Sequence, residues 1–176
     1  MHVETDRLKL IPLNLEQLKL LKTDRMKLEE DLGLKFSNMI IPEEVKEEMH
    51  KSVDFWLQNV EKFRDAYYWY TNWEIVQKEM NTSIGGFGFN GQPDENKVLE
   101  IGYVIDEKFQ NKGYMTEVIR VMTAWAFKNS DAKIILAQTP KDNYPSQKVL
   151  FKNSFTKKDE DSKAITWELK RKDLDL

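Results

Sequence analysis

The stretch QNKGYMTE, residues 110–117, has the residue types of an anion-binding turn. It follows an apolar, strand-like run at 98–105 and leads into a helix-like run at 117–127. The first N–H groups of a helix have no partner within the helix and carry partial positive charge, which suits a phosphate. Gly113 would let the backbone approach such a ligand closely. The octet therefore predicts a phosphate site, and an ordinary helix start on a polar loop is the competing interpretation.

A second helix start lies further along the chain, in NYPSQKVLFKNSF at 143–155. Asn143 is a residue type that caps helices, and Pro145 suits the first turn. This stretch follows a short apolar run at 133–139, which is typical of a buried strand. The two helix starts therefore both follow strands, and ligands of open sheets bind where such strands end.

Both helix starts lie in a chain that is predicted to contain strands and helices in succession. Spacing of apolar residues predicts strands at 3–13, 67–79, 82–90, 98–105, 133–139, 154–159 and 164–170, and helices at 13–24, 24–32, 41–66, 113–128 and 143–153. No linker, repeat or low-complexity tract interrupts them, and the length suits one domain over residues 1–176.

The composition argues against several classes of function. The chain has no cysteine, which excludes disulfides, thiolate metal sites and a cysteine nucleophile. Two histidines, His2 and His50, make a histidine-rich metal site or a Ser-His-Asp triad improbable, and no metal is expected. A net charge of −3 does not favour nucleic acid. No apolar run approaches the roughly 18 residues of a membrane helix, so we expect a cytoplasmic protein without a membrane segment.

Together these stretches resemble the GNAT N-acetyltransferase superfamily, in particular the branch typified by the ribosomal-protein N-terminal acetyltransferases. Residues 110–115 follow its pattern of Gln or Arg, two residues, Gly, one residue, then Gly or Ala, except that Met115 stands last. The resemblance covers nearly the whole chain, and 30–68, a region that tends to shape the acceptor site in such enzymes, matches poorly. It implies an α/β (α+β), GNAT-type three-layer fold, with a mixed central sheet of about seven strands and helices on both faces.

The resemblance also implies acetyl-CoA as the cosubstrate. Main-chain N–H groups of 112–116 would bind the pyrophosphate, strand 103–105 would pair with the pantetheine arm, and Asn143 would bond that arm from its other side. The implied coenzyme-binding residues are Tyr103, Val104, Ile105, Gln110, Asn111, Lys112, Gly113, Tyr114, Met115, Thr116, Asn143 and Ser146. The partner would be an amine-bearing acceptor, and the chain a monomer or homodimer.

Acetyl transfer needs a neutral amine, and Glu100 is the predicted general base. It lies on the strand that would carry the pantetheine, and alternation places it on the face opposite Ile101. An ordinary surface glutamate is the competing interpretation. Glu74, on the neighbouring strand, is the second candidate, and a bound water is the third.

The departing thiolate needs a proton, for which Ser146 and Tyr144 are the two candidates. Ser146 follows Asn143 by about one helical turn, and the phenol of Tyr144 has a suitable reference pKa of about 10. The main-chain N–H near Val104–Ile105 would stabilise the oxyanion.

Three questions stay open at this level. The aromatic residues between 67 and 73 either line an acceptor pocket or pack in the core. Ser154 stands where the family usually has glycine, so either Ser154 keeps the left-handed conformation at a cost of about 1 kcal/mol, or Asn153 takes that conformation instead. The acceptor is a protein N-terminus, a polyamine or a small antibiotic amine, and a non-catalytic acyl-CoA-binding module is the alternative function.

Overall fold

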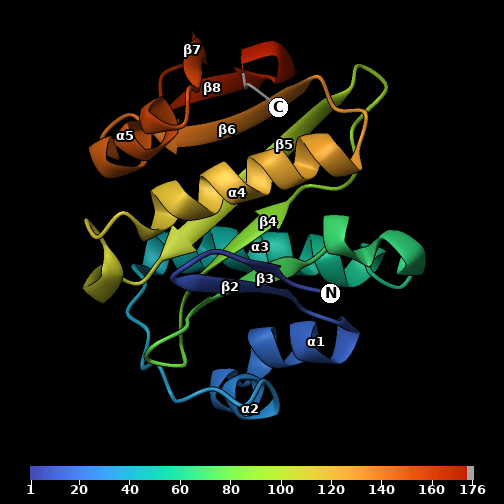
Figure 1. Cartoon of the computed structure of the whole chain (residues 1–176), viewed down its shortest axis with the longest axis vertical. Helices are drawn as coiled ribbons and strands as arrows, with labels where there is room; N and C mark the ends of the chain where they lie inside the picture. The colour runs from blue at the N-terminus through green and yellow to red at the C-terminus, as the bar shows by residue number, and fades with distance from the viewer. Residues whose placement is uncertain (174–176) are drawn as a thin grey trace. The chain divides into compact units, whose positions relative to one another are not determined.

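The computed structural model describes residues 1–173, apart from the side chains of Glu44 and Asp173, and the chain forms two compact units. The first unit comprises Met1–Asn90 and Tyr103–Gln110, and the second comprises Gly91–Gly102 and the chain from Asn111 onward. Figure 1 shows the elements of both. The prediction of one domain stays a prediction.

Antiparallel strands form the sheet of the first unit. Its strands are β1 (Val3–Glu4), β2 (Leu8–Pro12), β3 (Asn72–Gln77) and β4 (Thr82–Phe89), each paired with the next. A turn separates β1 from β2, because the Leu8 N–H donates to the Thr5 hydroxyl at 2.9 Å and the Thr5 N–H to the Leu8 carbonyl. The predicted strand 3–13 is therefore two strands, and residues 1–173 contain eight strands rather than about seven.

Helices of the first unit are α1 (Leu15–Thr23), α2 (Arg25–Asp31) and α3 (Glu43–Asn59), with 3-10 turns η1 (Arg64–Trp69) and η2 (Glu107–Phe109). Asn14 and Gln17 form a capping box that starts α1, as local cap chemistry predicts. The predicted helix 41–66 ends earlier, at Asn59, and the predicted strand start at 67 is wrong. Tertiary packing decides this turn, since the Trp73 indole donates to the Tyr68 carbonyl at 2.8 Å.

Helix α3 packs its apolar stripe into the core of this unit. Val53, Trp56 and Val60 are buried, and the Trp56 indole donates to the Phe89 carbonyl at 2.9 Å. A Cβ at Gly88 would lie 2.2 Å from the Trp56 ring, so a glycine is required there. The stripe on α3 thus serves core packing.

The second unit has a mixed sheet. Strand β5 spans Val98–Ile105, and its residues Val98–Ile101 pair in parallel with β6 (Ile134–Pro140). Strand β6 pairs antiparallel with β8 (Ala164–Lys170), and β8 pairs antiparallel with β7 (Thr156–Glu160). A parallel pair needs a long crossover, which α4 (Tyr114–Asn129) supplies. Helix α5 (Tyr144–Lys152) contacts α4, and a 3-10 turn η3 (Arg171–Asp173) follows β8. The predicted mixed α/β fold is confirmed.

Ser154 takes the left-handed conformation that ends α5. Its φ is +64°, whereas Asn153 has φ −103°, so of the two alternatives Ser154 keeps the left-handed conformation and Asn153 does not take it. The Asn153 side chain instead donates to the Val149 carbonyl at 2.9 Å, and the Phe155 N–H returns to the Leu150 carbonyl at 3.1 Å. Phe155 is thereby drawn into the core, where it is buried.

We predict that Ser154→Gly raises the free energy of unfolding by about 1 kcal/mol, since glycine adopts positive φ without the Cβ penalty. Asn153→Gly is the matched control one position earlier. It should lower the same quantity, because φ is negative there and the bond to Val149 is lost. Urea denaturation measures both, and a destabilised Ser154→Gly protein would contradict the prediction.

Candidate functional site

The loop before α4 has the backbone of an anion site. Asn111 has φ +60° and Gly113 has φ +80°, so the chain turns sharply before the helix begins at Tyr114. Gly113 is the N-cap residue, and no side chain caps this helix. Since the first N–H groups of a helix lack an acceptor within the helix, this helix start is a candidate for binding an anion.

Met115, the departure from the glycine-rich pattern, is directed into the core. It lies in the first turn of α4 and is 4% exposed. A buried side chain leaves the outer surface of the turn to the backbone, so methionine at this position is compatible with a phosphate at the helix start. Lys112 adds an exposed cation beside it.

Helix α5 presents the second predicted group of residues. Asn143 is its N-cap, and the side-chain oxygen accepts the Ser146 N–H at 3.1 Å. A carboxamide whose oxygen is used in this way offers its N–H₂ group to another acceptor. Ser146 lies three positions after Asn143 and so shares its side of the helix, whereas Tyr144 points elsewhere and is 72% exposed. This geometry favours Ser146 over Tyr144 as a partner for a ligand held by Asn143.

Strand β5 carries Glu100 with its side chain exposed, between buried Leu99 and Ile101. Glu100 pairs in register with Leu136 of β6, in the second unit. Within this unit, Glu100, the loop 111–116 and the start of α5 all belong to the β5–α4–β6–α5 segment. The side chain of Glu100 thus lies on the face of β5 opposite to Leu99 and Ile101, as the alternation of the sequence predicts.

The other predicted coenzyme residues belong to the first unit. Tyr103, Val104 and Ile105 are half-buried at the end of β5, and Gln110 closes this unit. A Cβ at Gly85 would lie 2.2 Å from the Val104 carbonyl oxygen. Glycine at position 85 thus allows the backbone of β4 to lie directly against that of Val104.

Glu74, the second candidate base, is committed to a buried network. It is 1% exposed, and its carboxylate accepts hydrogen bonds from Arg25, from the Ser83 hydroxyl and from the Asn72 side chain, the last at 2.9 Å. A base must reach its substrate and keep an oxygen available for a proton. These contacts therefore disfavour Glu74 as the general base.

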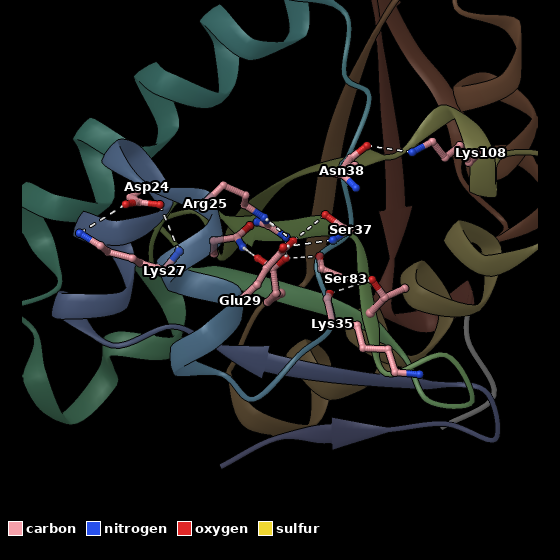
Figure 2. A network of polar contacts seen from close by, with 12 residues as sticks. Asp24, Arg25, Lys27, Glu29, Lys35, Ser37, Asn38, Ser83 and Lys108 are labelled. Atoms are coloured by element: carbon pink, nitrogen blue, oxygen red, sulfur yellow. Dashed lines mark hydrogen bonds and ion pairs between the residues drawn. The ribbon is translucent and has the colours of Figure 1, made fainter.

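Arg25 links Glu74 to a second buried carboxylate, that of Glu29. Figure 2 shows Arg25 and Glu29 side by side. Its Nε lies 3.0 Å from Glu29, which is also 1% exposed. Burial by itself lowers the pKa of Arg25, but the two carboxylates outweigh it, so the pKa is raised and the guanidinium stays charged. Sequence reasoning missed this network, for which the i,i+4 spacing of Arg25 and Glu29 is the one local signal.

The aromatic residues at 67–73 divide into two groups. Trp69, Tyr70 and Trp73 are buried, so for them core packing is the correct interpretation. Tyr67 is half-buried at an open hollow of about 240 Å³, and burial raises its pKa. The hollow is also lined by Asn14, Leu15, Val60, Glu61 and Arg64.

Residues 1–173 contain no group of three or more His, Asp or Glu side chains placed to hold a metal ion. Across the same range, no helix combines the length and the apolar content needed to cross a membrane.

Comparison with known families agrees with this fold. A family model described as an acetyltransferase (GNAT) domain matches residues 7–156. The uncharacterized N-acetyltransferase YjdG of Bacillus subtilis (strain 168) is 37% identical over 86 residues, which are 49% of this chain and 51% of that protein. The uncharacterized N-acetyltransferase p20 of Bacillus licheniformis is 34% identical over 83 residues, 47% of each chain. The matched region thus spans about half the length of these relatives.

Solved structures match over almost the full chain. Ribosomal-protein-S5-alanine acetyltransferase from Vibrio fischeri has a TM-score of 0.68 at 18% identity, with 98% of each chain covered. RimL, a ribosomal L7/L12 alpha-N-protein acetyltransferase in complex with coenzyme A, also has a TM-score of 0.68 at 18% identity, with 97% of this chain and 98% of that chain covered. At these identities the likeness shows the fold.

We predict that Arg25→Met lowers the free energy of unfolding by about 3–5 kcal/mol, since it leaves Glu29 and Glu74 buried without their cation. Arg64→Met is the control, because the Arg64 side chain is 79% exposed and its pair with Glu61 lies at the surface. That change should cost at most about 1 kcal/mol. Equal losses in urea denaturation would show that the buried network contributes no more than a surface pair.

Proposed function

We propose that this chain, which belongs to the acetyltransferase (GNAT) domain family, is an acetyl-CoA-dependent N-acetyltransferase acting on a primary amine. The observation that carries the proposal is the start of α4. No side chain caps this helix, its N-cap Gly113 is left-handed, and it comes after β5 and η2 in the chain. This backbone suits a pyrophosphate, and it lies within residues 7–156, which the family model matches.

The coenzyme would be held mainly by backbone groups. The N–H groups of 112–116 would donate to the pyrophosphate, and Lys112 would add positive charge. Tyr103–Ile105 would pair with the amide groups of the pantetheine arm, and the Asn143 N–H₂ would donate to the same arm. RimL, which shares this fold, has been solved in complex with coenzyme A, which supports this choice of cosubstrate.

The reaction would be a direct attack. The amine nitrogen forms the new C–N bond as the thioester C–S bond breaks, and Glu100, directly or through a water, takes the proton that the amine loses. An N–H near Val104–Ile105 would stabilise the oxyanion. Ser146 would return a proton to the thiolate. Tyr144 is the alternative donor, which its exposure makes less suitable.

The acceptor that we propose is a protein N-terminus. An α-amine has a reference pKa of about 7.7–8.0 against about 10.4 for lysine, so about a tenth of it is neutral at pH 7. A single carboxylate such as Glu100 then suffices as the base. Two proteins with this fold are named as acetylating ribosomal proteins, one at alanine of S5 and one at the α-amine of L7/L12.

A thiol-release assay with acetyl-CoA tests the function. The acceptors are peptides with a free α-amine, the same peptides blocked at the N-terminus but carrying lysine, spermine and an aminoglycoside. We expect the highest turnover with the free α-amine peptides. Preference for spermine or the aminoglycoside would favour a small-amine enzyme. Binding of acetyl-CoA without turnover of any amine would favour the non-catalytic acyl-CoA-binding module.

We predict that Gly113→Asp weakens coenzyme A binding by about 100-fold or more, because it places a carboxylate where the pyrophosphate should lie. Gly113→Asn is the matched control, since asparagine has the same shape, is neutral and tolerates positive φ. It should lose about tenfold or less. If calorimetry shows that both variants lose the same affinity for coenzyme A, the pyrophosphate does not bind at Gly113.

We predict that Glu100→Gln lowers kcat by about 10²–10⁴-fold at pH 7 and leaves coenzyme affinity nearly unchanged, since the carboxylate acts on the amine. The loss should shrink as pH rises, because more of the amine is then neutral without help. It should also be smaller for an α-amine than for lysine.

Glu95→Gln is the control for the loss of one exposed carboxylate in the same unit. It should retain full activity. Full activity of Glu100→Gln at pH 7 would exclude Glu100 from the mechanism, provided that the thermal midpoints of both variants match that of the parent.

A further inference from the structure

The segment Phe36–Ile41, here called the strap, connects α2 to α3 without helix or strand. Its first anchor is Ser37, whose N–H and hydroxyl both donate to Glu29, at 3.1 Å and 2.5 Å. Glu29 is the buried carboxylate that Arg25 ties to Glu74 (Figure 2). One end of the strap is therefore bonded to a buried carboxylate that is itself held by an ion pair.

The other end of the strap lies on the turn Asp106–Phe109. The Ile40 N–H donates to the Asp106 carboxylate at 3.3 Å, and the Glu107 N–H donates to the Ile40 carbonyl at 3.4 Å. The Lys108 ammonium donates to the Asn38 carbonyl at 2.8 Å, a contact seen at the right of Figure 2. All these residues belong to the first unit.

The contact between strap and turn is incomplete. Both bonds of Ile40 are long for N–H···O hydrogen bonds, which are commonest near 2.9–3.0 Å. Asp106 is fully buried, yet its second carboxylate oxygen has no hydrogen-bond partner among residues 1–173. Buried polar atoms are normally satisfied, so a strap drawn closer to the turn would shorten two bonds and could bring a donor to that oxygen.

Apolar burial does little to hold the strap in place. Phe36 is 54% exposed and Ile40 is 49% exposed, and Met39 and Ile41 are only half-buried, so no apolar side chain of the strap is fully buried. Segments with few buried apolar contacts open at low free-energy cost. The strap is therefore suited to change its contacts without unfolding the unit.

We infer that the strap closes on the turn Asp106–Phe109 when coenzyme binds to the loop that follows this turn. The inference rests on the proposed function. The turn continues without a break into Gln110 and the loop 111–116, so a phosphate that fixes the loop also fixes Asp106 and Lys108, which anchor the strap. Because such coupling is reciprocal, a strap that holds the turn also strengthens coenzyme binding.

Hydrogen exchange with and without coenzyme A tests the inference, with calorimetry of coenzyme A binding on the same samples. The amides to follow are those of Ser37, Ile40 and Glu107, each of which donates in the contacts described. Saturating coenzyme A should slow their exchange by about fivefold or more, the lower end of typical coupling.

Two variants loosen the strap at different points. Lys108→Met removes the bond to Asn38, and Ser37→Ala removes the hydroxyl bond to Glu29 without changing any charge. Lys35→Met is the control, since Figure 2 shows the Lys35 ammonium directed away from the network. Lys35→Met should keep the full protection, whereas the other two should lose most of it and bind coenzyme A more weakly by a similar factor.

The outcomes separate the two proposals. Absence of coenzyme A binding would overturn both the proposed function and the strap. Binding without slower exchange of the strap amides would overturn the strap alone. If Lys108→Met binds coenzyme A more weakly but keeps the full slowing of amide exchange, Lys108 contacts the phosphates directly and the strap is not coupled to binding. Unchanged slowing of exchange in Ser37→Ala would also overturn the inference.

Discussion

The N–H groups at the start of α4 have no partner inside the helix, and this constraint organises the second unit. This helix begins after two left-handed residues, Asn111 and Gly113, and no side chain caps it, so water or a ligand is suited to accept from its first turn. Met115 secures the same turn from the inside, where it is buried. The parallel pair of β5 and β6 requires α4 as its crossover, so the sheet and the candidate anion site depend on the same element.

The first unit depends on a different interaction, a buried network of charged side chains. Two carboxylates, Glu29 and Glu74, share one guanidinium and several hydroxyl and amide donors. Such a network is costly to assemble and costly to break, and it fixes α2 against β3. Glu74 is thereby used for structure, and of the two candidate bases only Glu100, on β5, has an exposed side chain.

Local chemistry explains what could be predicted from the sequence. Asn14 and Asn143 were identifiable as caps because capping depends on residues within one helical turn. The turn Arg64–Trp69 was not, because the aromatic residues that favour a strand are held there by tertiary contacts, including the bond from Trp73 to Tyr68. At the candidate site, the helix start after Gly113 and the exposure of Glu100 follow from motif and alternation, whereas the roles of these residues stay predictions. The bond of Arg25 to Glu74 joins residues 49 positions apart, and the contact of the strap with Asp106 spans 66 positions, so no local pattern indicates them.

Nuclear magnetic resonance of the labelled chain during a coenzyme A titration tests the central claim most directly. If the start of α4 binds the pyrophosphate, the amide resonances of 112–116 will show the largest shifts, and pantetheine, which lacks the phosphates, will leave them nearly unmoved. Saturable binding of coenzyme A that shifts other amides and leaves 112–116 unchanged would contradict the account.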